Sequence, residues 1–151
     1  MKKKINRVVV FFAITAICSI VGLILSILSY FTGYYVLGEM NSIWMFIAIG
    51  TAILVQIVNF ILNIKIKNEW IFTILNAFIS ILMIISFALL IGDRVEGIGF
   101  TIVTQFDAGH GGAEACYLSF GACGAWLLGS ILKIVESFLK TPSEKRLSSQ
   151  N

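Results

Sequence analysis

Four long apolar stretches alternate along the chain with short polar or charged segments. The stretches cover about residues 8–31, 43–64, 71–91 and 116–138. A helix needs ~20 apolar residues to cross the hydrocarbon core of a bilayer, and each stretch is long enough. The pattern predicts an all-α integral membrane protein, an up-and-down bundle of four transmembrane helices. We expect one membrane domain, residues 1–138, followed by a polar tail, residues 139–151.

The first apolar stretch follows the basic segment MKKKINR and therefore shares one feature with signal peptides. A signal peptide has an apolar core of ~7–15 residues that ends at an A-x-A-like site. This stretch is longer and contains no such site. Ile17 precedes Cys18 at the place where a lipoprotein cleavage site needs a small residue. We therefore expect an uncleaved first span.

The composition indicates that lipid is the main solvent of this protein. The chain is 58% hydrophobic and 13% charged, whereas a soluble domain carries roughly 25% charged residues. The net charge of +3 is too small and too scattered for a nucleic-acid-binding protein. The lipid bilayer is therefore an expected partner, and nucleic acid is not.

The three cysteines form no CxxC pair, which argues against a dithiol redox site and against a disulfide framework. Cys116 and Cys123 are too far apart along a regular helix to bond to each other. We expect Cys123 to be inert in lipid or in the packed interior. Cys116, near the outer boundary of its span, is a candidate for an intermolecular disulfide.

Lysine and arginine are divided unevenly between the two ends of the predicted bundle. Arg94 alone lies on one side, in the segment 92–115. The other ten are assigned to the side of the N-terminus: Lys2, Lys3, Lys4, Arg7, Lys65, Lys67, Lys133, Lys140, Lys145 and Arg146. Cytoplasmic loops carry the excess of Lys and Arg. We therefore expect a cell-membrane protein with both termini in the cytoplasm and an outer loop between the third and fourth helices.

Polar residues form matching faces on the second and third predicted spans. The spacing places Gln56, Asn59 and Asn63 on one helix face. Thr73, Asn76 and Ser80 have a related spacing on the next span. A short turn joins the two spans, so they should be antiparallel neighbours. This predicts an interhelical polar ladder that pairs Asn63 with Thr73, Asn59 with Asn76, and Gln56 with Ser80. The ladder would serve as packing contacts or as a polar pathway for a solute.

Charged residues are missing at membrane depth from the first three predicted spans. Glu39 lies in a connection between spans. Charges inside spans usually mark proton relays, ion sites or substrate pathways. The pattern therefore disfavours a proton-coupled transporter and an ion channel that acts alone. It also disfavours a four-span multidrug exporter, for which we would expect an embedded carboxylate.

Small residues form a stripe on the fourth predicted span at Gly121, Ala125 and Gly129. A second stripe comprises Ala115, Ser119 and Cys123, and the first span has one at Cys18, Gly22 and Ser26. Such stripes allow helix backbones to approach closely. They indicate either packing of the first helix against the fourth or docking of a partner, and the fourth span has small residues on two sides.

The segment 92–115, GDRVEGIGFTIVTQFDAGHGGAEA, is rich in glycine and holds the only histidine. Its part Phe100–Phe106 is too short for periodicity to distinguish a strand, an interfacial helix and an irregular segment. Isolated strands are marginally stable, so we expect a helical or irregular segment. The candidate recognition residues in this loop are Arg94, Glu96, Asp107, His110 and Glu114.

Motifs for catalysis and metal binding are not evident in the sequence. No H-x-x-H or H-E-x-x-H pattern is present. The single His110 has no partner set that would make it a general base. We therefore expect no catalytic residue, no metal and no cofactor.

The segment from Arg94, Val95 and Glu96 to the turn Asp107–Gly109, placed before a small-rich fourth helix, resembles small four-span membrane proteins of low-GC bacteria. Those proteins have no assigned function. The resemblance covers about a third of the chain, and it implies four spans and no particular activity.

These observations favour a non-enzymatic membrane protein that acts through contacts, as an accessory or partner-binding subunit. The partner would be a second copy of the chain or another membrane protein, bound through the outer loop and the fourth helix. The alternative is a transporter or channel subunit for a neutral or lipophilic solute. A third hypothesis, an enzyme acting on a lipid, would need the outer acidic residues and His110 to converge.

Overall fold

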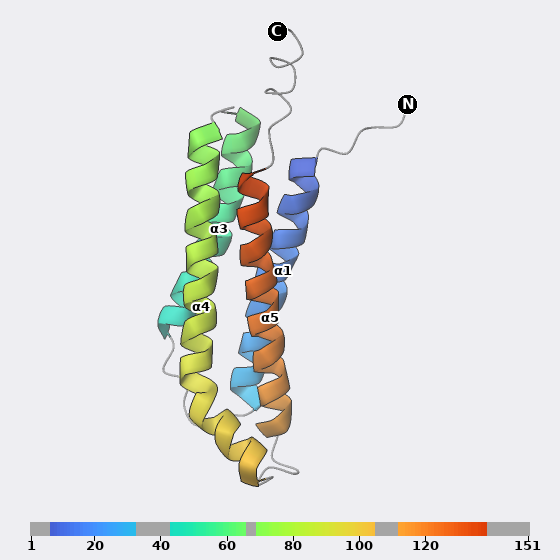
Figure 1. Ribbon diagram of the computed structural model, residues 1–151, viewed down its shortest axis with the longest axis vertical. Helices are drawn as coiled ribbons and strands as arrows, with labels where there is room; N and C mark the ends of the chain where they lie inside the picture. The colour runs from blue at the N-terminus through green and yellow to red at the C-terminus, as the bar shows by residue number, and fades with distance from the viewer. Residues whose placement is uncertain (1–6, 33–42, 66–68, 105–111, 139–151) are drawn as a thin grey trace, which may run out of the picture.

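The computed structural model describes residues 7–32, 43–65, 69–104 and 112–138, and these residues form four helices (Figure 1). The helices are α1 (Arg7–Thr32), α3 (Ile43–Lys65), α4 (Glu69–Thr104) and α5 (Gly112–Ser137). They pack as an antiparallel bundle in which the start of α1 and the end of α5 lie at the same end (Figure 1). The all-α class and the four-helix bundle are thus confirmed.

Each of the four helices is long and apolar enough to cross a membrane. The candidate spans are Val9–Thr32, Ile43–Leu62, Trp70–Val95 and Ala113–Ser137. These limits agree with the predicted spans to within about four residues at each end, because mean hydropathy is high throughout each stretch. The four helices therefore indicate a multi-pass membrane protein.

The structure corrects the predicted limits of the outer loop, because α4 continues to Thr104 and α5 begins at Gly112. The glycines at 92, 97 and 99 lie inside α4. Glycine lowers helix stability by ~1 kcal/mol relative to alanine, but it keeps the backbone N–H that proline lacks. The segment 100–104 is therefore helical, and residues 105 and 106 lie outside the described residues.

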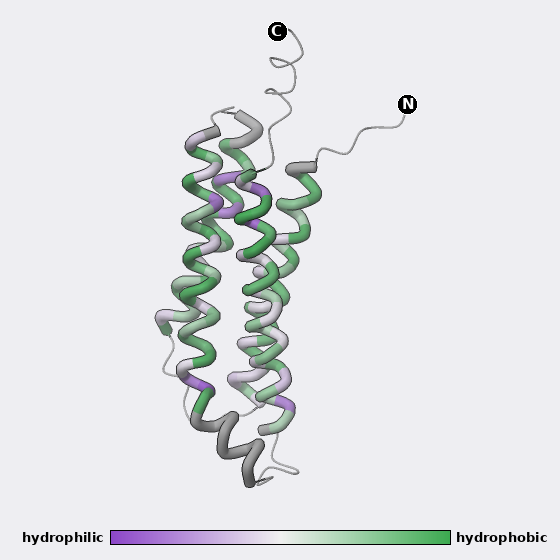
Figure 2. The backbone as a smooth tube through the Cα atoms, in the orientation of Figure 1, coloured by the Kyte–Doolittle hydropathy of each residue, from purple (hydrophilic) through white to green (hydrophobic). Residues whose placement is uncertain are grey.

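The bundle has apolar side chains outside and many polar side chains inside. Large apolar residues are strongly exposed on every helix, among them Ile17 (60%), Leu54 (66%) and Ile131 (55%). Figure 2 shows the four helices as mostly hydrophobic, with hydrophilic positions gathered near the upper end and at the lower ends of α4 and α5. The buried polar residues are Thr15, Ser19, Ser26, Ser29, Gln56, Asn59, Asn76, Ser80, Ser86, Arg94, Ser119, Ser130, Lys133 and Glu136. This arrangement suits lipid as the surrounding solvent.

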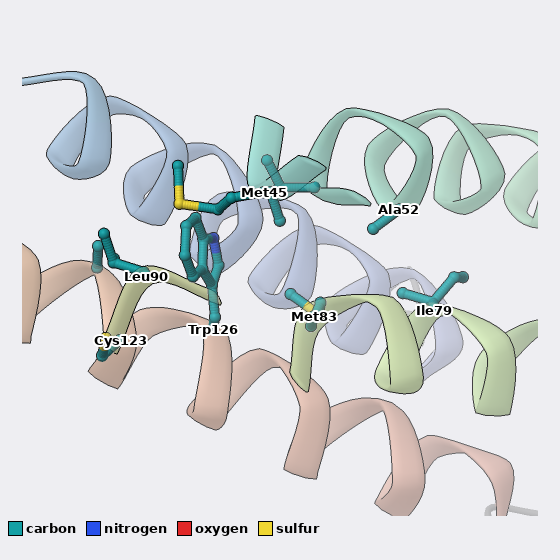
Figure 3. Close-up of a cluster of buried hydrophobic side chains, with 9 residues drawn as sticks. Met45, Ala52, Ile79, Met83, Leu90, Cys123 and Trp126 are labelled. Atoms are coloured by element: carbon teal, nitrogen blue, oxygen red, sulfur yellow. The ribbon is translucent and has the colours of Figure 1, made fainter. Parts of the chain in front are cut away.

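Helix α5 packs closely against α1 on one side and α4 on the other, whereas α1 and α3 touch only sparsely. One contact of α1 with α5 is at Gly22, where the Trp126 indole occupies the space that a Cβ would need. Figure 3 shows this indole projecting from α5 toward Met45, within a cluster that also contains Met83 and Leu90. The side of the bundle between α1 and α3 is therefore its least tightly packed seam.

Candidate functional site

The polar faces of α3 and α4 are only partly joined in the way the sequence suggested. Asn59 Nδ2 donates to Asn76 Oδ1 at 2.7 Å, so the middle rung of the expected ladder is present. Both side chains are buried. An amide pair of this kind joins two membrane helices without exposing polar atoms to lipid.

The expected pairing of Gln56 with Ser80 is wrong. Gln56 Nε2 donates to Thr15 Oγ1 at 2.7 Å, and Ser19 Oγ donates to Gln56 Oε1 at 3.2 Å, so this amide joins α3 to α1. Ser80 Oγ donates to the Ser130 carbonyl of α5 at 3.1 Å. The prediction considered only the two helices adjacent in sequence, whereas each of them has a second neighbour in the bundle.

The third expected rung, Asn63 with Thr73, depends on a side chain that the structure does not describe, so this pairing stays a prediction. Thr73 is exposed on the surface of α4. Asn63 lies in α3, and its side chain is outside the described part of the chain. The predicted ladder is thus reduced to one described rung between α3 and α4.

A double-mutant cycle distinguishes these two pairs. We expect the coupling energy between Asn59→Leu and Asn76→Leu to be about 0.6 kcal/mol, with an upper limit of ~1.7 kcal/mol. The coupling between Gln56→Leu and Ser80→Ala should be close to zero, because these side chains bond to different helices. The measurement is the free energy of unfolding of each single and double variant in detergent micelles. Strong coupling of Gln56 to Ser80 would contradict the contacts described above.

Near the end of the bundle that holds the start of α1, α5 contains a buried ion pair. Lys133 Nζ lies 2.7 Å from Glu136 Oε2, and each side chain is 1% exposed. Both residues fall inside the candidate span Ala113–Ser137. The expectation that the spans hold no embedded carboxylate is therefore wrong, and Lys133 does not belong to a water-facing end.

An aromatic pair lies beside this ion pair. Lys133 Nζ is 5.6 Å from the centroid of the Phe12 ring. The Phe12 ring stacks on Phe60, with centroids 4.2 Å apart and an angle of 21° between the planes. The two phenylalanines contact each other across the seam between α1 and α3, and both are half-buried. A cation, a carboxylate and two rings from α1, α3 and α5 thus meet at one place.

At the opposite end of the bundle Arg94 is 1% exposed. Its Nη2 donates to the Ser29 carbonyl of α1 at 3.2 Å. Its Nε and Nη1 are buried and have no hydrogen-bond partner among the described residues. Asp93 Oδ2 is also buried and has no hydrogen-bond partner among the described residues. The sequence suggested a water-facing Arg94, whereas the extended α4 carries this guanidinium into the bundle.

The surroundings of Arg94 connect α1, α4 and α5. Ser29 Oγ donates to the Ala115 carbonyl at 3.0 Å and lies 2.6 Å from Ser119 Oγ. Arg94 also interacts electrostatically with the carboxylate of the adjacent Asp93. Because Cys116 is only 6% exposed, its sulfur is not presented for the intermolecular disulfide considered from the sequence.

The other residues of the expected outer loop are not gathered into one site. Glu114 is exposed in the first turn of α5. Glu96 lies in α4, but its side chain is outside the described part, and Asp107 and His110 fall in the gap at 105–111. Within the described ranges no three His, Cys, Asp or Glu side chains are grouped to hold a metal ion.

The small-residue stripe of α5 divides between two environments. Gly129 is buried, and a Cβ there would come within 3.3 Å of Cys18 Cβ on α1 and would also meet Met83 of α4. Ala125 is half-buried, and Gly121 lies at the surface beside Leu25 of α1. In the second stripe Ala115, Ser119 and Cys123 are all buried. Much of the small-residue surface therefore serves contacts inside the bundle.

Sequence reasoning missed Glu136 entirely and misplaced Lys133. A usable signal was available, because Ser119, Trp126 and Lys133 follow one another at seven-residue spacing and hence share a helix face. Since Trp126 and Ser119 would be expected to pack inward, Lys133 should have been placed inward with them.

No protein family, curated protein or solved structure matches the chain in comparisons with known proteins.

Proposed function

We propose that the protein is a non-enzymatic accessory subunit that binds another membrane protein at the end of the bundle where Arg94 lies. One observation carries this proposal: a buried guanidinium with two of its three nitrogens unpaired among the described residues. A buried, unpaired charged donor destabilises a protein unless an acceptor is supplied. A partner that contributes a carboxylate or carbonyl group would satisfy Arg94 if the helix ends around this 1% exposed side chain separate when the assembly forms.

The nature of the partner follows from the chemistry of this end. Arg94 lies within the candidate span Trp70–Val95, so an acceptor has to reach it at the boundary of the membrane. A guanidinium binds carboxylates through two parallel hydrogen bonds, which gives both affinity and orientation. The expected partner is therefore a membrane protein with an acidic side chain close to the end of one of its spans.

The orientation proposed for the protein puts this end outside the cell. After the two buried residues Arg94 and Lys133 are set aside, the other nine of the eleven basic residues belong to the termini and the connection between α3 and α4. Such an excess favours the cytoplasm. Both termini would then be cytoplasmic, and α4 and α5 would present the Arg94 end to the outer face.

The alternative, a solute pathway along the polar faces of α3 and α4, receives less support. The Asn59 and Asn76 side chains bond to each other, and Gln56 and Ser80 bond to α1 and α5. Asn76 Nδ2 is buried and has no hydrogen-bond partner among the described residues, but the other groups are satisfied across the helices, so few are left to line a pathway. The catalytic alternative rests on His110, which lies outside the described residues.

A photocrosslinking experiment tests the proposal. A benzophenone side chain placed at Val95, which is 57% exposed beside Arg94, should give one discrete protein adduct in native membranes. The same probe at Ile131, 55% exposed on α5, is the matched control and should react mainly with lipid. Arg94→Gln should reduce the Val95 adduct at least tenfold, since the loss of a buried charged hydrogen bond typically costs 2–5 kcal/mol.

The readout is gel mobility followed by mass spectrometry of the adduct. Arg94→Lys, which keeps the charge, should retain more of the adduct than Arg94→Gln. Thermal unfolding of each variant in detergent verifies that the bundle is intact. An adduct that is equally strong in Arg94→Gln, or the absence of any protein adduct at Val95, would sink the proposal.

A further inference from the structure

We propose that the protein binds a lipophilic organic cation, such as a quaternary ammonium or phosphonium ion, between α1, α3 and α5. The cation site consists of the Glu136 carboxylate and the stacked rings of Phe12 and Phe60. In the structure the ammonium group of Lys133 occupies the position that the ligand's charge would take. This inference is independent of the Arg94 end and does not rest on the proposed function.

Packing of the bundle does not by itself account for the ion pair. Lys133 and Glu136 are three residues apart on the same helix, so their contact joins no two helices. Taking both charges out of water is costly, and a pair of apolar side chains is often as stable or more stable. Ionisable residues inside a membrane span usually mark a site for a proton, an ion or a substrate and not a packing contact.

The aromatic rings give the site its preference for organic cations. A cation within ~6 Å of a ring centroid is attracted by the negative face of the ring, and quaternary ammonium ligands are recognised in this way. Lys133 Nζ already has this relation to Phe12, at 5.6 Å. Phe60 extends the aromatic surface from α1 to α3, since the two rings are stacked at 4.2 Å. A bulky hydrophobic cation would therefore find a carboxylate on one side and aromatic carbon on the other.

The seam between α1 and α3 provides the approach from the membrane. These two helices touch only sparsely, and their contacts include the Phe12–Phe60 stack and the hydrogen bonds of Gln56 to Thr15 and Ser19. Phe12 and Phe60 are half-buried, so part of each side chain is accessible at the surface of the bundle. A lipophilic cation concentrates in the membrane and can reach the rings without crossing the bundle.

Exchange of the two cations requires Lys133 to move away from Glu136. Lys133 lies one turn before the end of α5, which is Ser137. A lysine stem is long enough to carry its ammonium group to the membrane surface from such a position. The ligand would then supply the positive charge that Glu136 needs, and the site would stay electrically balanced.

Binding of radiolabelled tetraphenylphosphonium to the purified full chain in a nonionic detergent tests the inference. Wild-type protein should bind it saturably with one site per chain, measured by equilibrium dialysis. Lys133→Met removes the competing ammonium and should bind it about tenfold more tightly, whereas Glu136→Gln should bind it at least tenfold more weakly. Phe12→Leu should weaken binding about threefold to tenfold.

Two controls separate this site from general hydrophobic adsorption. Glu114→Gln removes an exposed carboxylate at the opposite end of the bundle and should bind like the wild type. The neutral triphenylphosphine oxide should not compete. The ligand should also raise the unfolding temperature of Lys133→Met and leave that of Glu136→Gln unchanged.

Several results would overturn the inference. They are the absence of saturable binding in both wild type and Lys133→Met, equal binding by wild type and Glu136→Gln, and competition by the neutral compound at equal strength. If Glu136→Gln does not fold, cation binding by Phe12→Leu and Phe60→Leu tests the site instead. Unchanged binding in both of these variants would refute the site.

Discussion

Replacement of Lys133 by methionine should lower the free energy of unfolding by about 3–5 kcal/mol. The variant keeps the volume of the side chain but leaves Glu136 as an unpaired charge that is 1% exposed. A buried carboxylate without a partner loses its water and gains nothing in return. The measurement is equilibrium unfolding in mixed micelles, with fluorescence of the buried Trp126 as the signal.

The matched control is the double variant Lys133→Met with Glu136→Leu, in which both charges are absent. Because the pair joins no helices, we expect this variant to be within about 1–2 kcal/mol of the wild type, or more stable than it. The effects of the two substitutions should therefore be far from additive. A single Lys133→Met variant that is as stable as the wild type would show that the pair is not buried as described.

Substitution of Gly22 by leucine should prevent α1 from docking on α5. A Cβ at Gly22 would lie 2.6 Å from Cδ1 of the Trp126 indole, and Trp126 is fully buried. Smaller insertions into a packed core cost about 1–3 kcal/mol, and leucine adds four carbon atoms at this point. We expect a loss of at least ~3 kcal/mol, or failure to accumulate in the membrane.

Gly124→Leu is the control, because a Cβ at Gly124 meets nothing within 4 Å and this residue is exposed. Its stability should stay within about 1 kcal/mol of the wild type, since leucine favours a helix more than glycine does. A second check is Gly22→Ala combined with Trp126→Phe, which should recover part of the stability lost in Gly22→Ala. Equal losses in Gly22→Leu and Gly124→Leu would show that α1 and α5 do not meet as described.

The spans could be predicted from the sequence because each depends on the mean hydropathy of about twenty residues. The Asn59–Asn76 contact was also predictable, since a short turn fixes the register of the two helices it joins. The hydrogen-bond partners of Gln56 and Ser80 could not be predicted, because those partners lie on α1 and α5. Contacts between helices distant in sequence depend on the order of the helices around the bundle, which local patterns do not contain.

The two buried charged sites could not be recognised from average hydropathy. Lys133 and Glu136 lie near the end of an apolar run and look like part of a water-facing boundary. Arg94 was assigned to a loop because Gly92 precedes it and Gly97 and Gly99 follow it. Helix α4 nevertheless continues past all three glycines, to Thr104. The position of each residue around the helix axis would have revealed the burial of Lys133, because Lys133 shares a helix face with Trp126 and Ser119.

The charge content of α5 has a consequence for how the protein enters the bilayer. Its candidate span has the lowest mean hydropathy of the four. A lone lysine opposes insertion by roughly 2.5–3.5 kcal/mol at the centre of a span, and by less near its end, where Lys133 lies. Glu136, one turn further along the same helix, lets the two residues enter lipid together as a neutral pair. Ser119 and Ser130 also bond to groups on α1 and α4 or to their own helix. We therefore expect α5 to partition best into a bilayer that already holds α1 and α4.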